Sequence, residues 1–172
     1  MLQYLKSDDS GKLTIRENLV KGSWIRCERP NEEEISQLLS LGIDADIITD
    51  ALDPHEVPRL DADNERTYLI ARLPDTDDDF NDFTTPILFV IHADYIITIS
   101  RDSLGRLWQP FIDKHVVSTS SRITLLVDMI DALATQYQRR VAAINRQMRA
   151  ATGDIRTLRA RDIATLAEYE RK

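Results

Sequence analysis

The chain has 172 residues, of which 42% are hydrophobic and 30% are charged, which is the composition of a folded domain and not of a disordered tail. Its net charge of −7 is uneven, because Met1–Gln138 holds 13 basic and 25 acidic residues whereas Arg139–Lys172 holds nine and four. This acidic body argues against a nucleic-acid partner. The single cysteine, Cys27, excludes an intrachain disulfide and a cysteine-rich zinc site. No run of about 18 apolar residues is present, so no segment of the sequence is expected to span a bilayer.

The first part of the chain has the pattern of short strands separated by turns. The candidate strands are rich in apolar, β-branched and aromatic residues, and they are residues 2–5, 13–16, 23–27, 67–73, 87–91 and 95–99. Two helices are predicted between the third and fourth of these strands. Asn31 can cap a helix that begins with three glutamates and stops at Gly42, and Asp44 can cap a shorter helix that runs to Leu52.

The rest of the chain is predicted to be helical. Residues 104–115 can form one helix, and a much longer one begins at Ser120 or Ser121. Its apolar residues recur at steps of three and four, and they are Ile123, Leu126, Val127, Ile130, Ala134, Tyr137, Val141, Ile144 and Met148. A further helix over 155–169 is still under way at Lys172, so we expect the sequence to be a fragment. The pattern therefore predicts an α/β domain over residues 1–117 and a helical extension over residues 118–172.

Catalysis finds little support in the sequence. His55, His92 and His115 are scattered, Cys27 has no obvious neighbouring base, and the five glycines form no phosphate-binding loop. We therefore expect a protein that is not an enzyme, and an unrecognised hydrolase is the weakest hypothesis. Carboxylates suit hard cations such as magnesium or calcium, but the charge alone favours the simpler explanation of a solvated acidic surface.

Several short motifs follow one another along nearly the whole chain. They are Trp24-Ile25, the segment from Asp50 and Leu52 through His55 to Pro58-Arg59, Tyr68-Leu69-Ile70, Ile97 to Arg101, and Ile130-Asp131-Ala132-Leu133 with Tyr137. Their order and spacing resemble the cytoplasmic domain of the CorA family of magnesium and cobalt transporters. Zinc transporters of the same superfamily are close variants of that domain.

The resemblance implies a mixed β-sheet with helices on its faces, followed by long helices that lead to a stalk and to membrane helices beyond Lys172. It implies a homopentamer on the cytoplasmic face of the cell membrane, with the family's Gly-Met-Asn pore signature absent from this chain. It also implies regulatory Mg²⁺ sites between subunits, and the matching metal-ligand positions here are Asp50 and Asp131. Thr49 stands where the family has a glutamate, so such a site has one carboxylate fewer.

Other interpretations of these residues stay open. Asp131 lies along the edge of the apolar stripe and not on the solvent-facing side of the helix. A carboxylate there needs a partner, which is either a cation or an arginine. Asp50 could be an ordinary acid on a helix surface. A second hypothesis for the chain is a stand-alone interaction module that dimerises through the stripe from Ile123 to Met148. We expect the isolated fragment to be monomeric or weakly associated, because its acidic body repels other copies.

Overall fold

The computed structural model describes residues 1–76, 82–113 and 117–151. Within these residues, seven strands form one sheet in the order β2-β1-β3-β7-β6-β5-β4, in which β3 and β7 are parallel and all other neighbours are antiparallel. The strands are β1 (Leu2–Ser7), β2 (Leu13–Arg16), β3 (Ser23–Glu28), β4 (Arg59–Ala62), β5 (Arg66–Thr76), β6 (Asp82–His92) and β7 (Tyr95–Ser100). The helices are α1 (Glu32–Ser40), α2 (Ala45–Leu52), α3 (Gly105–Asp113) and α4 (Arg122–Ala151). The predicted mixed α/β fold with a long helix after it is confirmed.

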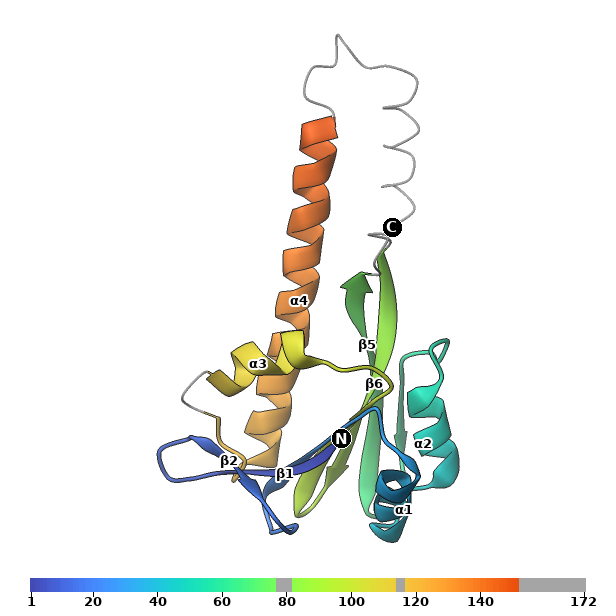
Figure 1. The fold of residues 1–172 in the computed structure, drawn as a ribbon, viewed down its shortest axis with the longest axis vertical. Coiled ribbons are helices and arrows are strands. Elements are labelled where there is room, and N and C mark those ends of the chain that lie inside the picture. Colours follow the sequence, from blue (N-terminus) through green and yellow to red (C-terminus); the bar gives the residue numbers. More distant parts are fainter. Residues whose placement is uncertain (77–81, 114–116, 152–172) are drawn as a thin grey trace.

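Helices cover both faces of the sheet (Figure 1). Successive side chains of a strand point to opposite faces, so each central strand contributes to two cores. Ile97 on β7 packs with α1 and α2 in one core, whereas its neighbour Ile96 packs with α3 and α4 in the other. The near-continuous apolar runs of β6 and β7 are explained by this two-sided burial.

Both short helices begin at the caps that the sequence predicts. The Asn31 side chain accepts a hydrogen bond from the Glu34 backbone at 2.8 Å, and the Glu34 carboxylate accepts one from the Asn31 backbone at 3.0 Å. Asp44 caps α2 by accepting from the Asp46 backbone at 2.8 Å. Gly42 follows α1 with a φ of +78°, a conformation that favours glycine and ends the helix.

The sheet contains one strand, β4, that was not predicted from the sequence. Three of the four β4 residues are exposed, so the strand lacks the alternation of apolar and polar residues that marks a half-buried strand. It forms because it pairs with β5 at the edge of the sheet, where Arg59 lies opposite Ile70. The helix predicted over 155–169 lies outside the described residues.

Helix α4 extends well beyond the α/β body (Figure 1). It is held to the body by Leu125, Met129 and Leu133, which are buried and spaced four residues apart. Most of the stripe singled out from the sequence lies on a different face, where Ile123, Val127, Ile130, Tyr137 and Val141 are exposed. The periodicity identified the helix correctly but did not identify the buried face. Within the described part of the chain, no helix is both long enough and apolar enough to cross a membrane.

Candidate functional site

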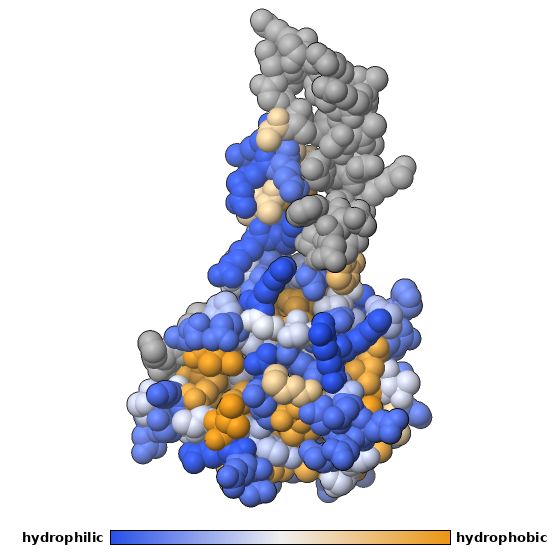
Figure 2. Space-filling view, in the orientation of Figure 1, coloured by the Kyte–Doolittle hydropathy of each residue, from blue (hydrophilic) through white to orange (hydrophobic). Residues whose placement is uncertain are grey.

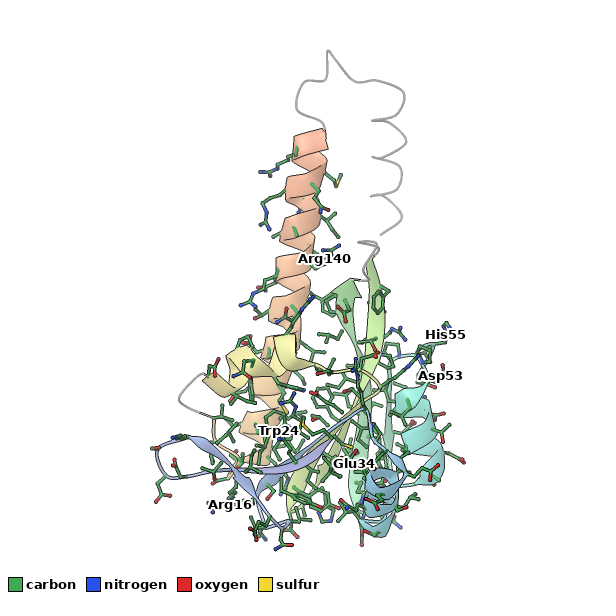
Figure 3. All side chains as sticks on the ribbon, in the orientation of Figure 1. Arg16, Trp24, Glu34, Asp53, His55 and Arg140 are labelled. Carbon is green, nitrogen blue, oxygen red and sulfur yellow. The ribbon has the colours of Figure 1, made fainter. Side chains whose placement is uncertain are left out.

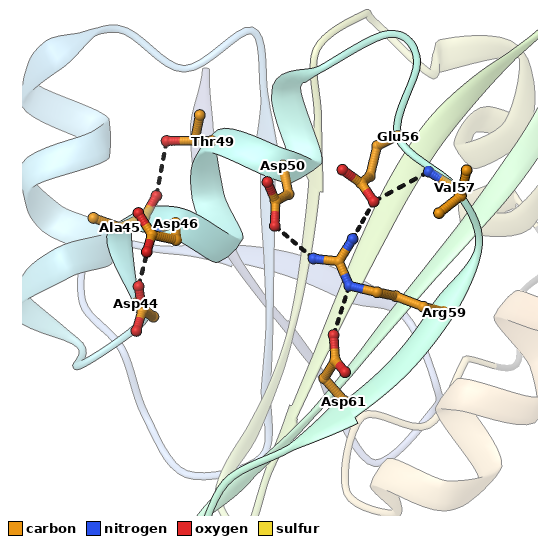
Figure 4. Close-up of polar contacts among 9 residues, drawn as sticks. All are labelled: Asp44, Ala45, Asp46, Thr49, Asp50, Glu56, Val57, Arg59 and Asp61. Atoms are coloured by element: carbon orange, nitrogen blue, oxygen red, sulfur yellow. Dashed lines mark hydrogen bonds and ion pairs between the residues drawn. The ribbon is translucent and has the colours of Figure 1, made fainter.

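Asp50 lies in a cluster of charged side chains centred on Arg59 (Figure 4). Arg59 Nη2 donates to Asp50 Oδ2 at 2.5 Å, and Arg59 Nε donates to Asp61 Oδ2 at 2.6 Å. Arg59 Nη1 pairs with the Glu56 carboxylate. The hydrogen bonds to Asp61 and Asp50 raise the pKa of Arg59 above its ordinary value. One arginine therefore neutralises part of the charge of three carboxylates.

The chain reaches this geometry through the loop between α2 and β4. The Asp53 side chain accepts from the His55 backbone at 2.8 Å, which tightens the turn after α2 (Figure 3 labels both residues). Arg72 on β5 holds the loop from the other side, because its guanidinium donates to the carbonyl oxygens of Pro54, at 2.9 Å, and Glu56. The motif residues that resemble the family pattern thus shape the loop that brings Arg59 to Asp50. Sequence reasoning missed Arg72, since nothing in its strand pattern marks it as a loop anchor.

Thr49, next to Asp50 on α2, carries a hydroxyl group that is hydrogen-bonded within the helix. Its hydroxyl donates to the Ala45 carbonyl oxygen at 2.9 Å, one turn earlier in α2 (Figure 4). The position where the resembled family has a glutamate is therefore uncharged, and its one polar atom is used inside the helix.

Asp131 lies on α4, on the opposite side of the sheet from α2, so one chain does not bring Asp50 and Asp131 together. Asp131 is exposed, and no ion pair links it to another residue within ranges 1–76, 82–113 and 117–151. Across those same ranges, no group of three or more His, Cys, Asp or Glu side chains is arranged to hold a metal ion. Each of the two aspartates offers a single carboxylate. Magnesium commonly binds one or two carboxylates and keeps several waters, so one aspartate alone is only part of a ligand set.

The remaining candidates for chemistry are structural where they are described. Cys27 is fully buried in β3, and burial raises the pKa of its thiol to about 12, so the thiol stays protonated near neutral pH. His92 stacks on Tyr95 with ring centroids 4.4 Å apart, whereas His55 is exposed. His115 lies outside the described residues.

Comparison with known proteins identifies the family. Residues 21–172 match the profile of the CorA-like Mg²⁺ transporter protein. The chain belongs to this family. The match begins after β2 and covers strands β3 to β7 and all four helices, and it confirms the resemblance drawn from the motifs. No curated protein matches this CorA-like chain.

Solved structures show the same fold at low sequence identity. The complete CorA magnesium transporter from Methanocaldococcus jannaschii is 18% identical with a TM-score of 0.79, over 97% of this chain and 55% of that one. The soluble domain of the same transporter is 20% identical with a TM-score of 0.75, over 88% and 62%. The ZntB cytoplasmic domain from Vibrio parahaemolyticus is 15% identical with a TM-score of 0.72, over 96% and 68%. This CorA-like chain therefore spans about half the length of the complete transporter.

Proposed function

We propose that this chain is the cytoplasmic regulatory domain of a CorA-like transporter of divalent cations and that it senses magnesium. The observation that carries the proposal is the family match over residues 21–172, which includes the α/β body from β3 onward and the projecting helix α4. In the proposal the whole protein is a homopentamer anchored in the membrane by segments beyond this chain. The chain then acts by binding and by changing subunit contacts, without a catalysed reaction.

The proposed sensing residues are Asp50 and Asp131, each contributing one carboxylate where two subunits meet. Asp50 holds Arg59 through Oδ2, and no hydrogen bond to its Oδ1 is present within the described residues, so Oδ1 can bind a further partner. Asp131 is exposed on α4 and accessible to a neighbouring copy. A bound magnesium ion supplies positive charge that offsets the repulsion between acidic bodies. Loss of that charge lets the subunits separate, which shifts the population toward an open assembly.

The test uses the full-length transporter with Asp50→Asn and Asp131→Asn. We expect both variants to shift the midpoint of magnesium-dependent protease protection to higher magnesium concentration, because each removes one carboxylate from the shared site. Asp46→Asn and Asp128→Asn are matched controls on the same two helices, and we expect them to keep the wild-type midpoint. If Asp50→Asn and Asp131→Asn also keep it, the two residues are ordinary surface acids and the sensing proposal fails.

The identity of the ion is part of the proposal. Carboxylate oxygens favour magnesium, and zinc prefers nitrogen and sulfur ligands, which the cluster around Asp50 lacks. The same protection assay with zinc in place of magnesium separates the two ions. Protection by zinc at lower concentration than magnesium, lost in Asp50→Asn, would favour the zinc-transporting branch of the superfamily.

A second candidate function is self-association through α4. The exposed apolar residues Ile123, Val127, Ile130, Tyr137 and Val141 are separated by four, three, seven and four residues, which is the spacing of a coiled-coil seam. Sedimentation of the isolated chain distinguishes this function from the first. A tight dimer that is lost in Val127→Lys supports the interaction module, whereas a monomer supports the regulatory domain.

A further inference from the structure

A cavity of about 690 Å³ lies between the start of α3, the C-terminal end of β5 and the middle of α4. This volume is in the range of small-molecule sites, which is about 300–1,000 Å³. Four arginines line the cavity, and they come from three separate parts of the chain: Arg29 after β3, Arg106 on α3, and Arg139 and Arg140 on α4. Asp75 is the one acidic residue in its described lining. The cavity is thus strongly positive within a protein whose body is acidic.

Most of this positive charge is not neutralised by the protein. Arg29, Arg106 and Arg139 are exposed, and within the described residues none of them lies within 4.0 Å of a carboxylate. Arginines elsewhere in the body, such as Arg26 and Arg59, do form ion pairs. Because acids outnumber bases 25 to 13 in Met1–Gln138, a cluster of arginines without carboxylate partners is unexpected on composition alone.

The backbone at the start of α3 adds hydrogen-bond donors to the same cavity. The first backbone bonds of α3 run from Leu107 and Trp108 to the Leu104 carbonyl oxygen, both at 2.9 Å, so the preceding amides of Gly105 and Arg106 have no helical partner. A Cβ atom placed at Gly105 would meet no atom within 4 Å, so a ligand can approach this backbone closely. The partial positive charge of a helix N-terminus favours an anion here.

The frame that carries the arginines is fixed by specific contacts. Pro110 has no N–H to bond to the Arg106 carbonyl oxygen one turn earlier in α3. Gln136 on α4 donates to that oxygen at 3.5 Å, which links the two helices at the cavity. Arg29 has a φ of 48°, an uncommon conformation for a residue with a side chain, and its N–H donates to the Ser100 carbonyl oxygen at 3.0 Å. The backbone of Arg29 and of Arg106 is therefore held by contacts within the protein.

We propose that this cavity binds a soluble anion that carries more than one phosphate group. One guanidinium can donate to two phosphate oxygens at once, so Arg29, Arg106 and Arg139 together provide more donors than a single phosphate needs. Described residues of α4 after Leu133 contain four arginines and no acid, and Figure 2 shows this part of the helix as mainly hydrophilic. Since the ligand contacts both α3 and α4, its binding holds α4 against the body. This site is separate from Asp50 and goes beyond the proposed magnesium sensing.

The test is calorimetric titration of the 172-residue chain with sodium pyrophosphate and with ATP, without magnesium and at low ionic strength. We expect one site per chain and weaker binding of inorganic phosphate. Arg106→Gln and Arg139→Gln should each weaken pyrophosphate binding about tenfold, because each removes a charged hydrogen-bond donor. Arg16→Gln is the matched control, since Arg16 is an exposed arginine on β2, far from Arg140 (Figure 3). Circular dichroism establishes that the variants remain folded.

Three results would overturn the proposal. The first is equal weakening in Arg16→Gln and Arg106→Gln, which means that the anion is attracted by charge without a site. The second is binding to vesicles of phosphatidylglycerol through Arg139 with no binding of pyrophosphate or ATP, which assigns the arginines to a lipid surface. The third is self-association in sedimentation that is lost in Arg139→Gln and is unaffected by pyrophosphate, which assigns them to contacts between copies of the chain.

Discussion

Replacing Arg59 by glutamine tests whether the charged cluster at the end of α2 can respond to magnesium. In the wild type, Arg59 pairs with Asp50, Glu56 and Asp61, and these side chains are partly exposed, from 14% for Glu56 to 48% for Asp61. Pairs of this exposure contribute about 0.2–1 kcal/mol each, so the three together contribute roughly 1–2 kcal/mol to the free energy of unfolding. Arg59→Gln loses this contribution and leaves three carboxylates facing one another.

The cation that removes the repulsion should then stabilise the variant more than the wild type. Magnesium at ten times its dissociation constant adds about 1.4 kcal/mol to the free energy of unfolding. The assay is urea unfolding followed by circular dichroism, with and without magnesium, and with sodium chloride at matched ionic strength. We expect Asp50→Asn in the Arg59→Gln background to lose most of the magnesium effect. Equal stabilisation of Arg59→Gln by magnesium and by sodium chloride would refute the reasoning, because it would show screening without binding.

Three further predictions concern the core and α4. Burial raises the pKa of Cys27 from 9.0 to about 12, so its protonated thiol stabilises the fold fully below pH 9, and that contribution is lost as the pH rises from about 9 to 12. Between pH 8 and pH 10.5, the free energy of unfolding measured in urea should therefore fall more in the wild type than in Cys27→Ala. Met129→Ala should cost about 2–5 kcal/mol in the free energy of unfolding because Met129 is fully buried, whereas Ile130→Ala should cost about 0.5 kcal/mol because Ile130 is 44% exposed. Equal costs of the two variants in thermal unfolding would contradict the assigned buried face of α4. Trp24→Phe should cost about 1–3 kcal/mol, because it removes the 2.9 Å hydrogen bond from Trp24 Nε1 to the buried Thr98 hydroxyl, and a Thr98→Val background should reduce that cost.

Sequence motifs predicted which residues belong to the candidate site, but they did not predict the contacts among those residues. Asp50 and Arg59 belong to one sequence motif, and their contact depends on β4, which carries no strand signal of its own. Arg72 anchors the same loop from β5, the strand after β4, and its role appears only when the fold places β5 beside the loop that precedes β4. The cavity lined by arginines was not predicted, because Arg29, Arg106 and Arg139 are far apart in the sequence. Each is an ordinary exposed cation until the fold brings them to one place.

The sequence by itself determined the local elements. Helix caps, runs of β-branched residues and apolar residues spaced three and four apart all depend on interactions between residues that are near one another in the chain. Asn31, Asp44 and Gly42 mark the ends of helices through contacts with their near neighbours, and the sequence alone locates them. Only the tertiary structure decided which face of α4 is buried. A long helix carrying apolar residues on more than one face satisfies the same periodicity in several orientations. Contact with the core around Trp24 selects Leu125, Met129 and Leu133 and leaves Ile123 and Val127 exposed.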